Sequence, residues 1–260
     1  YDGNCIIQKY CKELSKARSA TCKMKRLSIE AAENLAAKFR VEMGFSLVEP
    51  LSVKTVLRKK NILTLFRPLS ERSYGLSLKS NTGNCFMLVN SNTTRGRQHF
   101  TIAHELYHLY YDENPTPHIC MDEQEASVVA EKNADLFASS LLMPREGVLQ
   151  VVSTEESVKR EIALSTVIKL EQFFSVSRQS LLFRLKAIGL LSESGLQSLL
   201  KIPVIESARQ YGYDTALYNK GNENLVIGDF GEKARKLYDS GKISEGHYQE
   251  LINLIYNGED

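Results

Sequence analysis

The sequence predicts an α+β fold in which a small β-sheet precedes two long helices and further helices complete the chain. Three short β-favouring segments, at residues 62–67, 74–79 and 85–90, are separated by turn-forming residues. Two longer segments then carry apolar residues at helical spacing, at residues 94–112 and from about 122 to 144. Beyond the second of these the pattern is almost wholly helical.

The first element is an amphipathic helix that begins after Ser28, a capping-type residue, and that Gly44 is placed to end. Its apolar face comprises Ile29, Ala32, Leu35, Ala36 and Phe39. Ser52 is placed to cap a second, shorter helix after Pro50. Two helices are therefore expected before the sheet.

The three β-favouring segments predict a small antiparallel sheet, with a hairpin at residues 81–84, where Asn and Gly favour a turn. Residues 85–90 come immediately before the helix at 94–112. They are interpreted in two ways, as an exposed sheet edge that pairs with an extended peptide or as a buried structural strand.

Composition excludes two broad classes of protein. At 43% hydrophobic and 25% charged residues, the chain is neither disordered nor membrane-embedded, and no stretch approaches the roughly 18 apolar residues of a membrane span. We expect no membrane partner and a cytoplasmic location. The net charge of +2 does not by itself indicate nucleic-acid binding.

The five cysteines form no CxxC pair, which favours free thiols over a disulfide framework. Three of them lie in the first 22 residues, and a metal site built from them is an alternative. We divide the chain into a basic N-terminal arm (1–26), a core (27–150), a helical subdomain (151–191) and a C-terminal extension (192–260).

The helix predicted at 94–112 contains the sequence HELYH, an HExxH motif. Residues four apart face the same side of a helix, so His104 and His108 can bind one zinc ion. Glu105 is displaced from that face and is suited to accept a proton as a general base. The structural alternative is a pair of packed or surface histidines.

A catalytic zinc site needs a third protein ligand. The next helix offers Glu131, and Asp135 lies one turn further on, where it can orient a liganding histidine by a hydrogen bond. A ligand on a regular helix is held more rigidly than one in a loop, which favours Glu131. The competing ligands are Asp122, Glu123, Glu125 and His118.

These segments resemble the ImmA/IrrE family of bacterial and phage metallopeptidases. The first block, residues 97–108, follows R-x-x-F-T-x-A-H-E-x-x-H, and the second, residues 131–144, reads EKNADLFASSLLMP. Asp135 stands where the family has asparagine. The resemblance runs from about residue 28 to 191 and implies a zincin-like minimal metallopeptidase core with zinc held by His104, His108 and Glu131.

The resemblance also implies a function, namely cleavage of a helix-turn-helix transcriptional repressor, which switches on stress, phage-defence or mobile-element genes. The oxyanion formed during cleavage usually needs a second donor. The candidate donors are Tyr74, Tyr107, Tyr111, His99 and Arg97.

A second hypothesis is DNA binding, because residues 170–188 have a helix-turn-helix rhythm. Arg178, Arg184 and Lys186 lie on or beside its second helix and would contact DNA. DNA could also act as the trigger for cleavage, sensed by this pair or by the basic arm. The alternative is that the two helices pack behind the active site, which their apolar residues favour.

A third hypothesis makes the protein a binding or toxin–antitoxin component in which the metal is structural. Structural zinc sites are normally closed by four protein ligands, and the general base offered by Glu105 argues against that arrangement.

Overall fold

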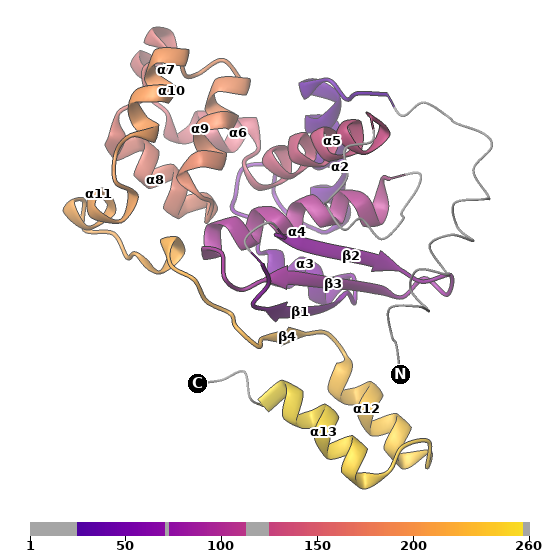
Figure 1. Cartoon of the computed structure of the whole chain (residues 1–260). Coiled ribbons are helices and arrows are strands. Elements are labelled where there is room, and N and C mark those ends of the chain that lie inside the picture. The colour runs from indigo at the N-terminus through magenta and orange to yellow at the C-terminus, as the bar shows by residue number, and fades with distance from the viewer. Residues whose placement is uncertain (1–24, 71–72, 113–124, 257–260) are drawn as a thin grey trace.

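The computed structural model describes residues 25–70, 73–112 and 125–256 (Figure 1). The elements up to the second long helix are α2 (Ile29–Glu42), α3 (Val53–Lys59), β1 (Leu63–Arg67), β2 (Gly75–Lys79), β3 (Cys85–Asn90), α4 (Arg95–Tyr110) and α5 (Glu125–Leu142). The remaining elements are α6 (Arg145–Val151), α7 (Thr154–Lys159), α8 (Leu164–Phe174), α9 (Arg178–Ala187), α10 (Glu193–Leu200), α11 (Val204–Gln210), η2 (Ala216–Tyr218), β4 (Val226–Ile227), α12 (Phe230–Asp239) and α13 (Glu245–Tyr256). The fold is mixed α+β, as the sequence predicts.

The sheet has four strands in the order β2-β3-β1-β4. β2 and β3 form the predicted hairpin, in which Gly83 adopts a φ of 85° that favours glycine. β1, however, pairs with β3 in parallel, so the sheet is mixed and the prediction of an antiparallel sheet is wrong for this pairing. β3 is an interior strand, which corrects the interpretation of residues 85–90 as an edge.

The fourth strand comes from the C-terminal part of the chain. Val226 and Ile227 pair antiparallel with Leu65 and Thr64 of β1. Just before this strand, Asn222 donates a 2.7 Å hydrogen bond to Gln98 near the start of α4. Residues 192–260 are therefore not a separate extension throughout, because part of this segment completes the core sheet.

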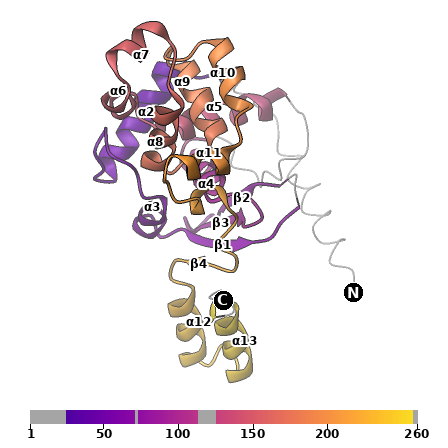
Figure 2. The same ribbon diagram turned by 90° about the vertical axis from the view of Figure 1, so that its left-hand side faces the viewer.

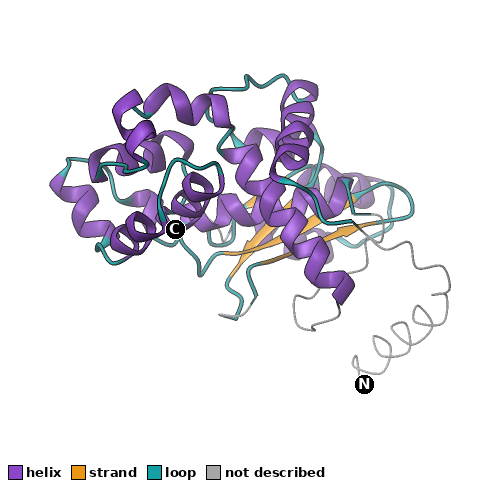
Figure 3. Cartoon of the chain, turned by 90° about the horizontal axis from the view of Figure 1, so that it is seen from above, coloured by secondary structure: helices purple, strands orange, loops and turns teal. Residues whose placement is uncertain are grey.

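One face of the sheet is covered by helices (Figure 3). On β3 the side chains of Cys85, Met87 and Val89 are buried, alternating with half-exposed neighbours, as expected for a strand with one covered face. α4 packs against this sheet and α5, and α5 packs in turn against α2. Phe137 of α5 lies edge-on to Phe39 of α2, with 5.9 Å between ring centroids.

The predicted helix pair at residues 170–188 corresponds to α8 and α9. The turn between them packs against α4, because a Cβ atom on Gly96 would lie 2.8 Å from the Ser177 backbone nitrogen. The buried apolar residues of the pair are Val167, Ile168, Leu170, Phe174, Leu181, Leu182 and Leu185. The pair is thus part of the packed core.

The last two helices, α12 and α13, pack against each other, with Tyr238 stacked on Tyr248 at 5.1 Å between ring centroids. They lie beyond β4, on the side of the sheet edge away from α8 to α11 (Figures 1 and 2). Among the described helices none is both long and apolar enough to cross a membrane.

Candidate metal centre

The two histidines of the HExxH motif lie on the same side of α4. Thr94 caps the helix by accepting a hydrogen bond from the Arg97 backbone nitrogen, and the regular helix continues to Tyr110. The spacing of four residues therefore brings His104 and His108 together, with ring centroids 5.0 Å apart. Their Nε2 atoms are 3.2 Å apart.

Glu131 of α5 faces this histidine pair. Its Oε2 lies 3.1 Å from His104 Nε2, and its Oε1 lies 3.4 Å from His108 Nε2. The three side chains offer ligand atoms that lie within 4.8 Å of one another, a group that could hold a metal ion. The packing of α5 against α4 produces this arrangement from residues that are 27 positions apart.

The spacing of these atoms fits zinc. Ligand atoms placed 2.0–2.1 Å from a tetrahedral centre are about 3.3 Å from one another. The Nε2 atoms of the two histidines, 3.2 Å apart, are close to that edge length, and each lies near one oxygen of Glu131, His104 at 3.1 Å from Oε2 and His108 at 3.4 Å from Oε1. Two imidazoles and one carboxylate are also a ligand set found in catalytic zinc sites, where the fourth position is left for water or substrate.

A carboxylate contacts the far nitrogen of each histidine. His104 Nδ1 lies 3.0 Å from Asp135, and His108 Nδ1 lies 3.1 Å from Asp112. If Nδ1 carries the proton and donates it to the carboxylate, each Nε2 presents its lone pair to a metal. Sequence reasoning proposed Asp135 but missed Asp112, although its position four residues after His108 is a usable signal.

The same carboxylates make the site attractive to a cation. Burial lowers the pKa of His104, but hydrogen bonds to Asp135 and Glu131 and the nearby charge of Glu105 outweigh it and raise the pKa to about 10. An environment that stabilises a positive imidazolium so strongly also favours a bound divalent cation.

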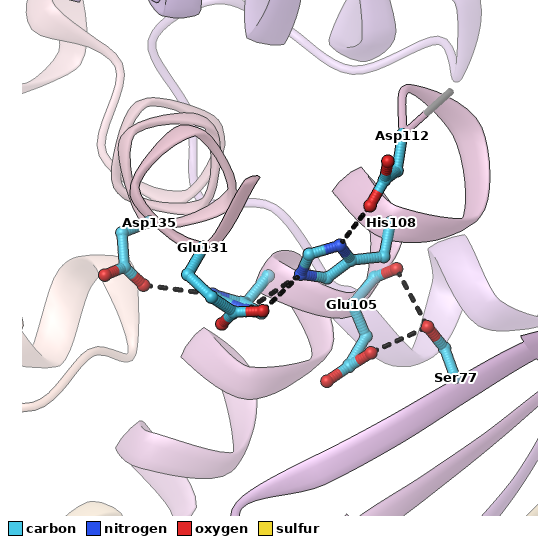
Figure 4. A network of polar contacts seen from close by, with 7 residues as sticks. Ser77, Glu105, His108, Asp112, Glu131 and Asp135 are labelled. Atoms are coloured by element: carbon cyan, nitrogen blue, oxygen red, sulfur yellow. Dashed lines mark hydrogen bonds and ion pairs between the residues drawn. The ribbon is translucent and has the colours of Figure 1, made fainter. Parts of the chain in front are cut away.

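Glu105 lies beside the cluster without belonging to it (Figure 4). Its side chain is buried, and Ser77 of β2 donates a 2.6 Å hydrogen bond to Glu105 Oε2. Gly75 approaches α4 so closely that a Cβ atom there would lie 2.5 Å from the Thr101 methyl group and 3.5 Å from Glu105 Oε1. Sequence reasoning missed Ser77, since no local pattern links it to Glu105, which is 28 residues away.

A cavity of about 660 Å³ opens over these residues. Its lining includes His104, Glu105, Glu131 and Asp135, together with residues of β2, α4, α5 and α9. A second cavity, of about 1310 Å³, shares part of this lining. The shared residues are Tyr74, Arg97, Ser177 and Gln179. The candidate metal centre thus lies in a groove with room for an extended chain.

The structure separates the five candidates for an oxyanion donor. Tyr74 and Arg97 line the cavity, and the Arg97 guanidinium stacks over the Tyr74 ring at 4.1 Å. Tyr107 is buried in the core, and Tyr111 packs on Phe137. His99 Nδ1 lies 2.8 Å from the Ser175 carbonyl oxygen, to which it donates, and burial lowers its pKa.

Two of the three residues expected to contact DNA are buried. Arg178 forms a 2.5 Å ion pair with Glu171, and Arg184 forms a 2.7 Å ion pair with Glu33. These guanidinium groups hold helices together and are not presented to solvent, which corrects their assignment to DNA contact. Only Lys186 is substantially exposed, in an ion pair with Glu193.

Several other expectations fall outside the described residues. The competing ligands His118, Asp122 and Glu123, the side chain of Glu125 and most of the basic arm are among them.

The α+β fold and the cluster of two histidines and one glutamate define a protein with a candidate metal centre on two packed helices. Residues 57–186 match the model of the M78 peptidase family, described as the IrrE N-terminal-like domain. The match spans half of the chain, from within α3 to near the end of α9, and the protein belongs to this metallopeptidase family. No curated protein matches the chain.

Proposed function

We propose that the protein is a zinc-dependent endopeptidase whose ligands are His104, His108 and Glu131. The observation that carries the proposal is the convergence of their three ligand atoms beside Glu105 in an open cavity. Membership in a metallopeptidase family supports it. The zincin-like character expected from the sequence belongs to the same proposal.

Each side chain has a distinct role in peptide hydrolysis. Bound zinc would acidify water and polarise the peptide carbonyl. Glu105 accepts a proton from the attacking water and delivers it to the leaving amine. Ser77 holds the Glu105 carboxylate in place for both transfers. Asp135 and Asp112 hold the histidine rings in the orientation that directs Nε2 towards the metal.

The edge strand β2 offers a surface for an extended substrate. No described strand pairs with it on the side away from β3. Just outside its two ends, Tyr74 accepts a hydrogen bond from Asn90 of β3, and Ser80 donates one to Asn84, which precedes β3. The alternation of an antiparallel ladder therefore turns the backbone groups of Gly75, Ser77 and Lys79 towards the open edge. A peptide added there by backbone pairing would pass beside Glu105.

For the substrate we propose a helix-turn-helix transcriptional repressor, whose cleavage would derepress stress, phage-defence or mobile-element genes. The proposal rests on the family resemblance carried by residues 97–108 and 131–144. A groove that continues from the metal centre into a second cavity is compatible with a polypeptide substrate.

The decisive experiment incubates the zinc-loaded protein with the repressor encoded beside its own gene. The wild type is compared with Glu105→Gln, which keeps all three ligands. We expect a discrete cut by the wild type and none by the variant, with equal zinc content in both. An intact repressor in both reactions would contradict the proposed substrate, and loss of zinc in the variant would contradict the role of Glu105.

A further inference from the structure

One wall of the cavity over the metal centre is formed by α9 and its N-terminal cap. Its residues there are Ser177, Gln179, Ser180, Phe183, Arg184 and Ala187. α9 is the second helix of the pair that the sequence analysis predicted to contact DNA. Because its other side is packed in the core, its exposed surface faces the cavity next to His104 and Glu105.

Phe183 is the prominent apolar group on this wall. Its residue surface is 49% exposed, whereas most large apolar residues of α9 are buried. A partly exposed aromatic side chain within a concave site is a typical anchor for an apolar ligand group. Phe173, on α8, is similarly exposed at 41% but does not line the cavity, so exposure alone does not distinguish the two.

The rest of the wall leaves space beside Phe183. Leu136 and Phe100 add apolar surface from α5 and α4, while Ala187 and Ser180 are small. The charged group of Arg184 is engaged by Glu33 and by the Met143 carbonyl oxygen. The site therefore combines an aromatic surface with room for a side chain several carbons long.

The direction of β2 indicates which substrate residue reaches this wall. β2 runs from Gly75, which lines the cavity, to Lys79, whose Nζ lies 3.5 Å from the Leu109 carbonyl oxygen at the far end of α4. Antiparallel pairing is the more stable arrangement per residue, and a peptide that pairs antiparallel to β2 runs in the opposite direction to it. The part that follows the scissile bond, which supplies the leaving amine, then lies at the Gly75 end, in the cavity.

We infer that α9 forms the subsite for the residue immediately after the scissile bond, and that Phe183 makes this subsite select a large apolar side chain such as Leu, Met or Phe. The inference rests on the proposed peptidase function and adds its sequence preference.

The test uses the zinc-loaded full chain and a proteome-derived peptide library, with cut sites read by mass spectrometry. We expect large apolar residues directly after the cut to be favoured about tenfold over Ala and Gly, a typical discrimination for an apolar pocket. Phe183→Ala should abolish most of this preference. Phe173→Ala is the matched control and should retain it.

A second variant tests the same subsite by making it smaller, whereas Phe183→Ala makes it larger. Ala187→Phe narrows the cavity and should shift the preference from large towards small residues. Both positions are exposed, so neither substitution disturbs the buried core, and zinc content with far-ultraviolet circular dichroism checks the fold.

The failures of the two proposals are distinguishable. Three results would contradict the subsite but not the peptidase function. They are cleavage with no preference for the residue after the cut, cleavage with a preference only for the residue before it, and a preference that is unchanged in both Phe183→Ala and Ala187→Phe. No cleavage by the wild type above the level of Glu105→Gln would overturn the peptidase function, and the subsite with it.

Discussion

Ser77 and Glu105 are joined by a hydrogen bond of 2.6 Å, from the serine hydroxyl to one oxygen of the carboxylate. The bond connects the edge strand β2 with α4, the helix that carries both histidines. It engages Oε2, while Oε1 lies towards Gly75, which lines the cavity. This hydrogen bond couples β2 to the candidate general base, so a substrate that pairs with β2 would directly affect the position of Glu105.

Replacing Ser77 by Ala tests this coupling between β2 and Glu105. Without the hydroxyl, the Glu105 carboxylate loses its anchor, and we expect kcat to fall about tenfold or more while KM changes little, since general-base catalysis depends on positioning. Ser77→Thr keeps the hydroxyl and should retain most of the activity. Zinc content should be unchanged in both, because Ser77 contacts no ligand. Equal kcat in Ser77→Ala and the wild type would contradict the positioning role.

Asp112 is expected to support metal binding through His108. Its side chain is 1% exposed and receives the Nδ1 contact, so Asp112→Ala should free the ring to reorient and weaken zinc binding about 10–100-fold. The matched control is Asp239→Ala, which removes the carboxylate of an exposed pair with Arg235, also four residues apart. Competition with a fluorescent chelator measures both affinities. An unchanged affinity in Asp112→Ala would remove this residue from the site.

The raised pKa of His104 predicts how pH acts on the metal-free protein. The folded-state value of about 10 lies above the ordinary value of 6.5, so the charged ring stabilises the fold fully below pH 6.5. This contribution, of the order of a few kcal/mol, is lost as the pH rises through about 10. Chemical denaturation between pH 6 and 10 should show the loss in the metal-free protein and not in the zinc-loaded one, where no proton is bound.

Zinc uptake should accordingly release a proton from His104 at neutral pH. Calorimetric titrations in two buffers of different ionisation enthalpy count the protons released. We expect about one at pH 7.5 in the wild type. A titration with no buffer dependence would show that the ring is already neutral before the metal binds.

The cluster could be predicted because its signals are local. Their spacing of four places His104 and His108 on one helix face, and Glu131 lies on the next regular helix, which packs against the first. Ser77 carries no such signal, since its contact depends on how β2 packs against α4. β4 was missed because two residues are too short to show a period, and the parallel pairing of β1 with β3 is set by long-range packing.

The charges on α9 were misinterpreted for a related reason. Arg178 and Arg184 resemble a basic surface in the sequence, but their partners are Glu171 on α8 and Glu33 on α2. A buried guanidinium needs such a partner, and a carboxylate 151 positions away cannot be identified from local spacing.

Because Arg178 forms a buried ion pair, we expect its replacement to destabilise the fold and not to remove a DNA contact. Glu171 also accepts a 2.6 Å hydrogen bond from Tyr218, so Arg178→Ala leaves a buried carboxylate without its cation. We expect destabilisation of about 3–5 kcal/mol in urea unfolding. Lys186→Ala, at an exposed ion pair, should change stability by less than about 1 kcal/mol. A DNA-reading α9 would instead give salt-dependent binding that Lys186→Ala weakens.

The absence of a side chain at Gly96 allows the α8–α9 turn to pack closely against the start of α4. We therefore expect a substitution at Gly96 to change both the stability of the protein and its cleavage specificity. A Cβ atom there would lie 2.8 Å from the Ser177 nitrogen and 2.9 Å from the Val176 carbonyl carbon, both backbone atoms. Gly96→Ala must therefore move the turn, strain the 2.8 Å contact of His99 with Ser175, and displace the α9 wall of the cavity.

Overpacking of this kind costs about 1–3 kcal/mol, which urea unfolding measures. The matched control is Gly246→Ala in α13, where the nearest atom is the Ser244 hydroxyl oxygen at 4.0 Å, and alanine in an open helix position is neutral or slightly stabilising. Because His104, His108 and Glu131 lie on α4 and α5, Gly96→Ala should keep zinc affinity while altering the preference after the cut. Reduced zinc affinity with an unchanged preference would show that the turn supports the metal centre and not the α9 subsite.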